Sequence, residues 1–210
     1  MAVCIALSAA AGGGKSSALL MGALQYADTP GYAALILRRT YPELSKADGM
    51  IPRSLEWLGG TDARWNQQEH RWVFPGGATL EFGHLQHESD VYQYHSAAYQ
   101  FIGFDELTTF TEFQYRYLFS RLRRPETSTI PLRMRSGSNP GGVGHDWVKQ
   151  RLLVEGLEHG RAFIPARLVD NPFLDRAEYE RSLSNLDPVT RSQLLNGDWS
   201  ARHGGSLFRR

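Results

Sequence analysis

Residues 3–17 read VCIALSAAAGGGKSS, and this stretch decides the fold class. Residues 3–7 are a continuous apolar run, which is typical of a buried strand. Three glycines lead from this run into Lys15 and Ser16, after which apolar residues support a helix as far as Leu24. A strand, a glycine-rich loop and a helix in this order predict the beginning of an α/β domain.

The glycine-rich loop matches the Walker A pattern G-x-x-x-x-G-K-[ST] except at its first position, which is Ala9. Glycines allow backbone amides to wrap around a phosphate chain, and the following helix N-terminus adds positive potential. Lys15 is expected to reach the β and γ phosphates, and Ser16 to bind Mg²⁺. The alternative, a flexible turn with an accidental lysine, is disfavoured by the strand and helix on either side. The predicted nucleotide ligands in this loop are Gly12, Gly13, Gly14, Lys15, Ser16 and Ser17.

Residues 101–106 read FIGFDE, an apolar strand that ends in two adjacent acids. Alone, such a pair is usually a helix N-terminus or a solvated loop. Together with Lys15 it becomes a Walker B pattern, in which Asp105 joins Ser16 in binding Mg²⁺ and the nucleotide, and Glu106 orients and deprotonates the attacking water. A glutamate directly after Asp105 favours a nucleotide hydrolase over a small-molecule kinase.

A third polar strand end occurs at residues 135–140, which read RSGSNP. In P-loop ATPases with a catalytic glutamate, this strand lies beside the P-loop strand, so a polar residue at its tip can sense the γ-phosphate. Asn139 is the candidate for this role. An ordinary Asn-Pro turn would be the first interpretation if the other two motifs were absent.

The rest of the chain alternates strands with helices, which predicts a three-layer α/β P-loop NTPase with a mostly parallel central sheet. We expect a hairpin inserted at residues 71–74 and 78–82, and a helix capped by Thr109 or Thr111. Residues 1–170 are expected to form the ATPase core, and residues 171–210 a helical and linker segment that closes it. Further strands are expected at 33–37, 130–135 and 162–165, and further helices after residue 41, around 147–152 and across 175–195.

The composition limits the partners without identifying them. The chain has 210 residues, enough for one domain, and its net charge of +1 provides no global argument for a polyanionic partner. The single cysteine, Cys4, excludes an internal disulfide and a cysteine-based zinc site, and it is expected to fill the core. The apolar start is too short for a signal peptide or a membrane span, so no membrane partner is expected.

Two groups of arginines are candidates for contacts with phosphate. Arg121 and Arg123, with Arg124, end the helix predicted after Walker B, where an arginine could neutralise transition-state charge on a neighbouring subunit. The alternative is equally ordinary, because basic residues favour helix C-termini and solvated faces. The second group lies near predicted strand tips, where pairing with acidic residues is the simpler interpretation and DNA phosphate the other: Arg38, Arg39, Arg133 and Arg135.

Taken together, these motifs resemble the ATPase domain of the large terminase subunit of tailed bacteriophages, from about residue 3 to the end of the chain. The resemblance includes residues 37–44 (LRRTYPEL), 101–110 (FIGFDELTTF), 138–142 (SNPGG) with Trp147, and 197–199 (GDW). It implies that Ser138 and Asn139 form a coupling motif, which relays loss of the γ-phosphate to movement of the domain against DNA.

The resemblance also implies a function, namely Mg²⁺-dependent ATP hydrolysis that powers translocation of double-stranded viral DNA into a procapsid. The implied cofactors are ATP and Mg²⁺. The implied partners are double-stranded DNA, the portal protein and the small terminase subunit, in a homo-oligomeric ring on the procapsid. The implied location is the host cytoplasm and, transiently, the procapsid portal. The residues expected to carry catalysis are Lys15, Glu106, Asn139, Arg121 and Arg123.

The sequence departs from the family's pattern in three places. Few residues precede the loop, where family members carry an adenine-recognition segment, and Ala11 stands where many members have an arginine. The family's nuclease domain would begin close to Arg210, so no nuclease activity is expected from these residues.

Two other functions are compatible with the sequence. One is an ATP-binding assembly or docking module with weak turnover, and the other is a different P-loop DNA motor such as a helicase-like ATPase. A two-lobed helicase would need a second motor lobe, which the residues after Asn139 are too few to form. Measured turnover would separate a motor from a docking module.

Overall fold

The structure is a computed structural model that describes residues 3–9, 14–166, 168–171 and 174–202. Ala11, Gly12 and Gly13 of the predicted phosphate loop lie outside the described residues.

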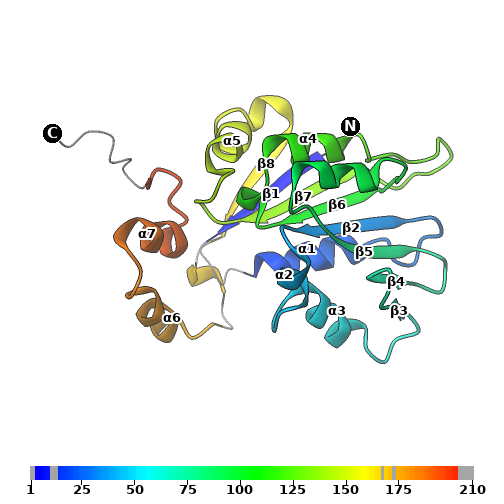
Figure 1. The fold of residues 1–210 in the computed structure, drawn as a ribbon, viewed down its shortest axis with the longest axis horizontal. Helices are drawn as coiled ribbons and strands as arrows, with labels where there is room; N and C mark the ends of the chain where they lie inside the picture. The colour runs from blue at the N-terminus through cyan, green and yellow to red at the C-terminus, as the bar shows by residue number, and fades with distance from the viewer. Residues whose placement is uncertain (1–2, 10–13, 167, 172–173, 203–210) are drawn as a thin grey trace.

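An eight-stranded sheet forms the centre of the molecule, with helices on both faces (Figure 1). The strand order is β3-β4-β5-β2-β6-β7-β1-β8, and all strands from β5 to β8 in this order run parallel. This confirms the expected mostly parallel three-layer fold. The strands are β1 (Val3–Ala9), β2 (Ala33–Arg38), β3 (Arg64–Asn66), β4 (Arg71–Val73), β5 (Thr79–His84), β6 (Phe101–Asp105), β7 (Arg133–Ser138) and β8 (Arg161–Ala166).

The helices of the described residues include several short 3-10 turns and a π-helical stretch that continues α5. None of the described helices is long and apolar enough to span a membrane. The α-helices are α1 (Lys15–Leu24), α2 (Tyr41–Ser45), α3 (Met50–Leu58), α4 (Glu112–Phe119), α5 (His145–Val148), α6 (Arg176–Leu183) and α7 (Pro188–Asn196). The other helical segments are η1 (Glu88–Tyr94), η2 (Leu107–Thr109), η3 (Lys149–Val154), η4 (Leu157–His159) and η5 (Leu168–Asp170).

The sheet divides the core into two parts, because successive side chains of a strand point to opposite faces. Leu35 and Leu37 of β2 pack toward α4 and α5, whereas Ala34 and Ile36 pack toward α1 and α3. All four side chains are fully buried. Burial on both faces explains why this strand reads as a continuous apolar run rather than as an alternating one.

The hairpin predicted at residues 71–82 is only partly correct. β4 and β5 pair antiparallel around the turn, as expected, but β5 is not an insertion, because it also pairs in parallel with β2 and so belongs to the main sheet. β3 pairs on the outer side of β4 and forms the edge. A strand with one antiparallel and one parallel neighbour cannot be recognised from its hairpin pattern alone.

Three further elements differ from the expectations or resolve them. The strand expected at 130–135 begins at Arg133, and Pro131 has no N–H to contribute to a ladder. Helix α3 is not among the expected elements. Its Pro52 is nevertheless compatible with a helix, because it lies in the first turn, where a missing N–H breaks no helical hydrogen bond. Of the two proposed N-cap residues, Thr111 caps α4, because its Oγ1 accepts a hydrogen bond from the backbone N–H of Gln114 at 3.3 Å.

Candidate nucleotide-binding site

Three neighbouring strands, β6, β7 and β1, bring Asp105, Glu106 and Asn139 to one edge of the sheet. Asp105 at the end of β6 is level with Gly137 of β7, which is level with Leu7 of β1 on its other side. Because parallel strands end at the same edge, Glu106 and Asn139, which directly follow β6 and β7, lie together beyond this row.

Two glycines allow α1 to begin directly above this edge. Gly14, the N-cap of α1, has a φ of +73°, which is the left-handed conformation that glycine adopts without strain. At Gly137 a Cβ atom would lie 3.2 Å from Cβ of Lys15 and 3.6 Å from Oδ1 of Asp105. The absence of a side chain at Gly137 therefore leaves space for the Lys15 side chain to extend toward the ends of the strands.

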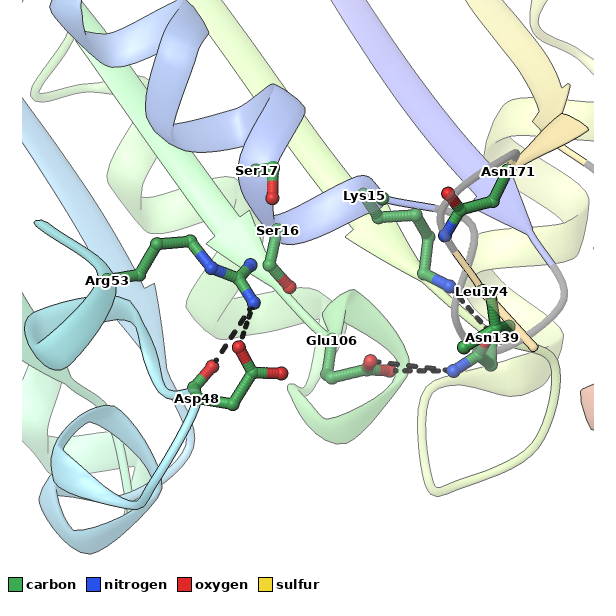
Figure 2. A pocket seen from close by; sticks show the side chains of 10 residues that line it. Lys15, Ser16, Ser17, Asp48, Arg53, Glu106, Asn139, Asn171 and Leu174 are labelled. Atoms are coloured by element: carbon green, nitrogen blue, oxygen red, sulfur yellow. Dashed lines mark hydrogen bonds and ion pairs between the residues drawn. The ribbon is translucent and has the colours of Figure 1, made fainter. Parts of the chain in front are cut away.

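A chain of hydrogen bonds connects Lys15 to Glu106 through Asn139 (Figure 2). Lys15 Nζ donates to Asn139 Oδ1 at 2.9 Å, and Asn139 Nδ2 lies 3.4 and 3.5 Å from the two Glu106 carboxylate oxygens. Only this orientation of the amide presents an acceptor to the ammonium and a donor to the carboxylate. Burial lowers the pKa of Lys15, and the nearby Glu106 carboxylate opposes that shift.

Glu106 adopts an uncommon backbone conformation for a residue with a side chain, with φ 58° and ψ 59°. Thr109 stabilises this turn, since its Oγ1 donates to the Glu106 carbonyl at 2.7 Å. The pKa of Glu106 is raised, mainly because burial penalises the carboxylate and also because Asp105 is adjacent. Strained backbone and a raised carboxylate pKa are both features that concentrate at functional sites.

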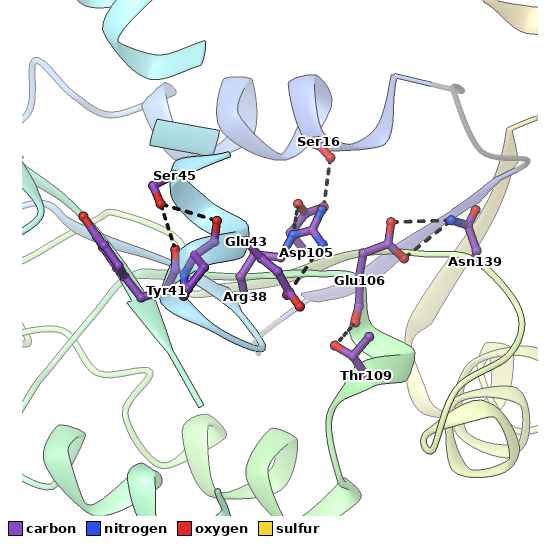
Figure 3. A network of polar contacts seen from close by, with 10 residues as sticks. Ser16, Arg38, Tyr41, Glu43, Ser45, Asp105, Glu106, Thr109 and Asn139 are labelled. Atoms are coloured by element: carbon purple, nitrogen blue, oxygen red, sulfur yellow. Dashed lines mark hydrogen bonds and ion pairs between the residues drawn. The ribbon is translucent and has the colours of Figure 1, made fainter. Parts of the chain in front are cut away.

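Asp105 is almost completely buried and is held from two sides (Figure 3). Ser16 Oγ donates to its Oδ1 at 3.0 Å, and Arg38 Nε donates to its Oδ2 at 2.7 Å. Arg38 therefore pairs with an acid, the simpler of its two interpretations. Arg39 and Arg133, from the same group of arginines, donate to uncharged groups.

The Ser16 and Asp105 pair fits a magnesium ion by its chemistry. Both offer hard oxygen ligands, and Mg²⁺ commonly takes one or two protein oxygens while phosphate oxygens and water complete its shell. Among the described residues, no group of three or more His, Cys, Asp or Glu side chains could hold a metal.

The turn after Glu106 is bound to the strand tip that carries Asn139. The Thr108 amide donates to Ser138 Oγ at 3.0 Å, and Thr108 Oγ1 donates to the Asn139 carbonyl at 3.0 Å. Thr108 and Ser138 are both buried. A displacement of Asn139 would consequently move the segment that follows Glu106, which is the mechanical property expected of a coupling motif.

The site opens into a cavity of ≈ 320 Å³, a volume within the usual range for small-molecule pockets (Figure 2). Ser17, which we expected to bind nucleotide, lines it with Gly14, Lys15, Ser16, Glu106 and Asn139. Asn171 and Leu174 line it from the segment after β8, and the sequence contained no pattern that would assign them. Asp48 and Arg53 line the cavity from the segment between α2 and α3 and from α3 itself. In the sequence, the helix that carries Arg53 is indicated only by the apolar residues Met50, Ile51 and Leu55.

The expectation that Arg121 and Arg123 end a helix is wrong, because α4 ends at Phe119 and both residues follow it. They lie at the opposite end of β6 from this cavity. Both are hydrogen-bonded through their backbone to Tyr99, which lies just before β6 begins. The Tyr99 N–H donates to the Arg121 carbonyl at 2.9 Å, and the Arg123 N–H donates to the Tyr99 carbonyl at 3.1 Å. Their guanidinium groups donate to the His95 and Ala97 carbonyls. The structure does not bring them to Lys15 within one chain, and a role on a neighbouring copy stays a prediction.

The sheet order, the helix that starts at Lys15 and the strand-end residues Asp105, Glu106 and Asn139 are those of the P-loop NTPase class of α/β domains. Residues 6–210 match the family described as terminase large subunit, T4likevirus-type, N-terminal. The chain belongs to this family. No curated protein matches it.

Solved structures of phage terminases share the fold. The large terminase of a thermophilic bacteriophage in complex with ADP has a TM-score of 0.72 at 15% identity, over 93% of this chain and 48% of that one. The complex of the same terminase with ATP-γ-S has a TM-score of 0.71 at 17% identity, over 94% and 47%. The ATPase domain of the Thermus phage P74-26 large terminase has a TM-score of 0.60 at 13% identity, over 93% and 88%. The chain thus spans about half the length of the first terminase.

Proposed function

We propose that this chain hydrolyses ATP with Mg²⁺ and that it uses the reaction to move double-stranded viral DNA into a procapsid, as the motor domain of a large terminase. The observation that carries this proposal is the hydrogen-bonded chain from Lys15 through Asn139 to Glu106, in the same cavity as Ser16. Membership of the terminase family and the nucleotide complexes of the thermophilic bacteriophage terminase support it.

The residues divide the chemistry among them. Lys15 contacts the β and γ phosphates, and Glu106 accepts a proton from the attacking water, for which a raised carboxylate pKa is favourable. Ser16 and Asp105 hold Mg²⁺, which neutralises phosphate charge when it is bound. Asn139, which bonds to Lys15 and Glu106, is placed to respond when the γ-phosphate leaves.

The motor function places the chain in an assembly. We propose a homo-oligomeric ring on the procapsid in the host cytoplasm, in contact with the portal protein, the small terminase subunit and DNA. Arg121 or Arg123 of one copy would then approach the site of the next. Family membership supports this proposal.

The first test is ATP hydrolysis with and without Mg²⁺ and double-stranded DNA, for the unmodified chain and its Lys15→Ala and Glu106→Gln variants. We expect Lys15→Ala to lose binding and turnover, and Glu106→Gln to keep binding while turnover falls at least about a hundredfold, as general-base loss implies. Binding without turnover in the unmodified chain would favour a docking module. Absence of nucleotide binding would overturn the proposal.

A further inference from the structure

The cavity contains a second cation besides Lys15, and the reaction described so far does not use it. Arg53 of α3 lines the cavity together with Ser16, Ser17 and Glu106. Figure 2 shows its guanidinium group directed toward Ser16, on the opposite side of Glu106 from Lys15. Its side chain is only 17% exposed. Guanidinium groups match phosphate geometry with paired N–H donors, which makes this position suitable for a triphosphate.

The backbone beneath Arg53 is fixed on its inner side. The next residue, Ser54, is fully buried and accepts a hydrogen bond from Trp72 Nε1 at 2.9 Å. Met50 and Ile51 of the same helix are buried in the core cluster that includes α1. Helix α3 is therefore anchored to the body of the domain, and Arg53 projects from a defined position rather than from a loop.

Among the described residues, Arg53 forms one ion pair, with Asp48, and replacing that carboxylate by a phosphate would cost little free energy. Its Nη2 pairs with Oδ1 of Asp48, whose side chain is 87% exposed. Asp48 also has a positive φ of 60°, so it lies on a strained turn before α3. Exposed ion pairs contribute little to stability, whereas a guanidinium bound to phosphate forms charge-assisted, paired hydrogen bonds. A bound triphosphate would therefore compete successfully with Asp48.

We propose that Arg53 is a catalytic residue that binds the terminal phosphate of ATP from within the same chain, and that Asp48 holds it in the absence of nucleotide. The proposal rests on the proposed function, because it concerns the same cavity. Arg53 lines the cavity together with Glu106 and Asn139, the residues that the proposed function assigns to the attacking water and the leaving phosphate, so in that function Arg53 contacts the terminal phosphate.

The test compares binding of ATP-γ-S and ADP by calorimetry with Mg²⁺ present. For Arg53→Ala we expect ATP-γ-S affinity to fall roughly ten- to a hundredfold, the range for hydrogen bonds to charged groups, while ADP affinity changes less than about threefold. Arg53→Lys should fall between, because lysine keeps the charge without the paired donors. Arg116→Ala, which removes an exposed arginine paired with Glu112 on α4, is the matched control and should change neither affinity.

Asp48→Asn gives a result that a structural role would not produce. If Asp48 competes with phosphate, its neutralisation should tighten ATP-γ-S binding by up to about fivefold, consistent with the small free energy of exposed ion pairs. The Arg53→Ala, Asp48→Asn double variant should then bind as Arg53→Ala does. If Asp48→Asn weakens binding as Arg53→Ala does, the pair is only a brace for α3 and the proposal is wrong.

The outcomes separate this inference from the proposed function. No binding of either nucleotide by the unmodified chain would overturn the proposed function and this inference with it. Binding that Lys15→Ala abolishes but Arg53→Ala leaves intact would overturn the Arg53 assignment alone. Equal losses of ATP-γ-S and ADP in Arg53→Ala, with unchanged circular dichroism, would also contradict a contact with the terminal phosphate.

Discussion

Glu106 combines a left-handed backbone with a partly buried carboxylate, and each is unfavourable for folding. Two variants separate them, because Glu106→Ala removes the carboxylate but keeps a Cβ at positive φ, whereas Glu106→Gly relieves both. We expect the glycine variant to be more stable than the alanine variant by about 1 kcal/mol in urea titrations, and both to be inactive. Equal stability of the two variants would show that the backbone of Glu106 is not strained.

The pH dependence of turnover provides a second test at Glu106. A general base must be ionised, and burial raises the pKa of this carboxyl above its ordinary 4.5, so turnover should be lost as the pH falls while still above 4.5. The measurement is kcat against pH at saturating ATP. Nucleotide affinity is the control, and it should not decline over the same range, because protonation removes a negative charge beside the phosphates. An acid limb at or below 4.5 would contradict the assignment.

The contact between β5 and η1 depends on a missing side chain at Gly83. A Cβ there would overlap the buried hydroxyl of Tyr94 and lie 3.2 Å from Cδ2 of Leu37. Gly83→Ala should therefore cost about 1–3 kcal/mol of unfolding free energy by overpacking. Gly76→Ala, whose Cβ would meet its nearest atom at 3.6 Å, is the matched control and should be close to neutral.

Tyr94→Phe removes the hydroxyl that a Cβ at Gly83 would meet. Combined with Gly83→Ala, it should recover part of the lost stability, which a double-mutant cycle by thermal or urea unfolding would measure. If Gly83→Ala is as stable as the unmodified chain, the approach of η1 to β5 is looser than the structure indicates.

The C-terminal helices are joined to the core through Trp199, which is buried. Its ring lies 5.2 Å from that of His145 and 6.2 Å from that of Phe163, and Lys149 Nζ donates to its carbonyl at 2.8 Å. Trp199→Ala should cost about 3–5 kcal/mol at this contact. If residues 171–202 are a separate closing segment, the loss will be local.

Limited proteolysis with mass spectrometry would measure that locality. We expect Trp199→Ala to be cleaved faster within residues 171–198, while residues 14–166 stay protected, and Leu186→Ala, at a partly exposed position, to behave as the unmodified chain does. Simultaneous loss of protection in both parts would contradict a boundary near residue 170.

The sequence by itself located the candidate site residues at or after the ends of the three central strands. Lys15 follows a glycine turn, Asp105 ends an apolar run with Glu106 directly after it, and Asn139 directly follows the next strand along the chain, so each is visible in a short local pattern. Such patterns suffice because parallel strands bring their ends to one edge whatever lies between them.

Only the tertiary structure decided which other side chains meet them. Arg38 reaches Asp105 across 67 residues because β2 is the neighbour of β6 in the sheet, and Arg53 reaches the cavity because α3 packs beside α1 on the same face. The same topology leaves Arg121 and Arg123 at the opposite end of β6. Strand order and helix packing depend on contacts between distant segments, and no local pattern of residues encodes them.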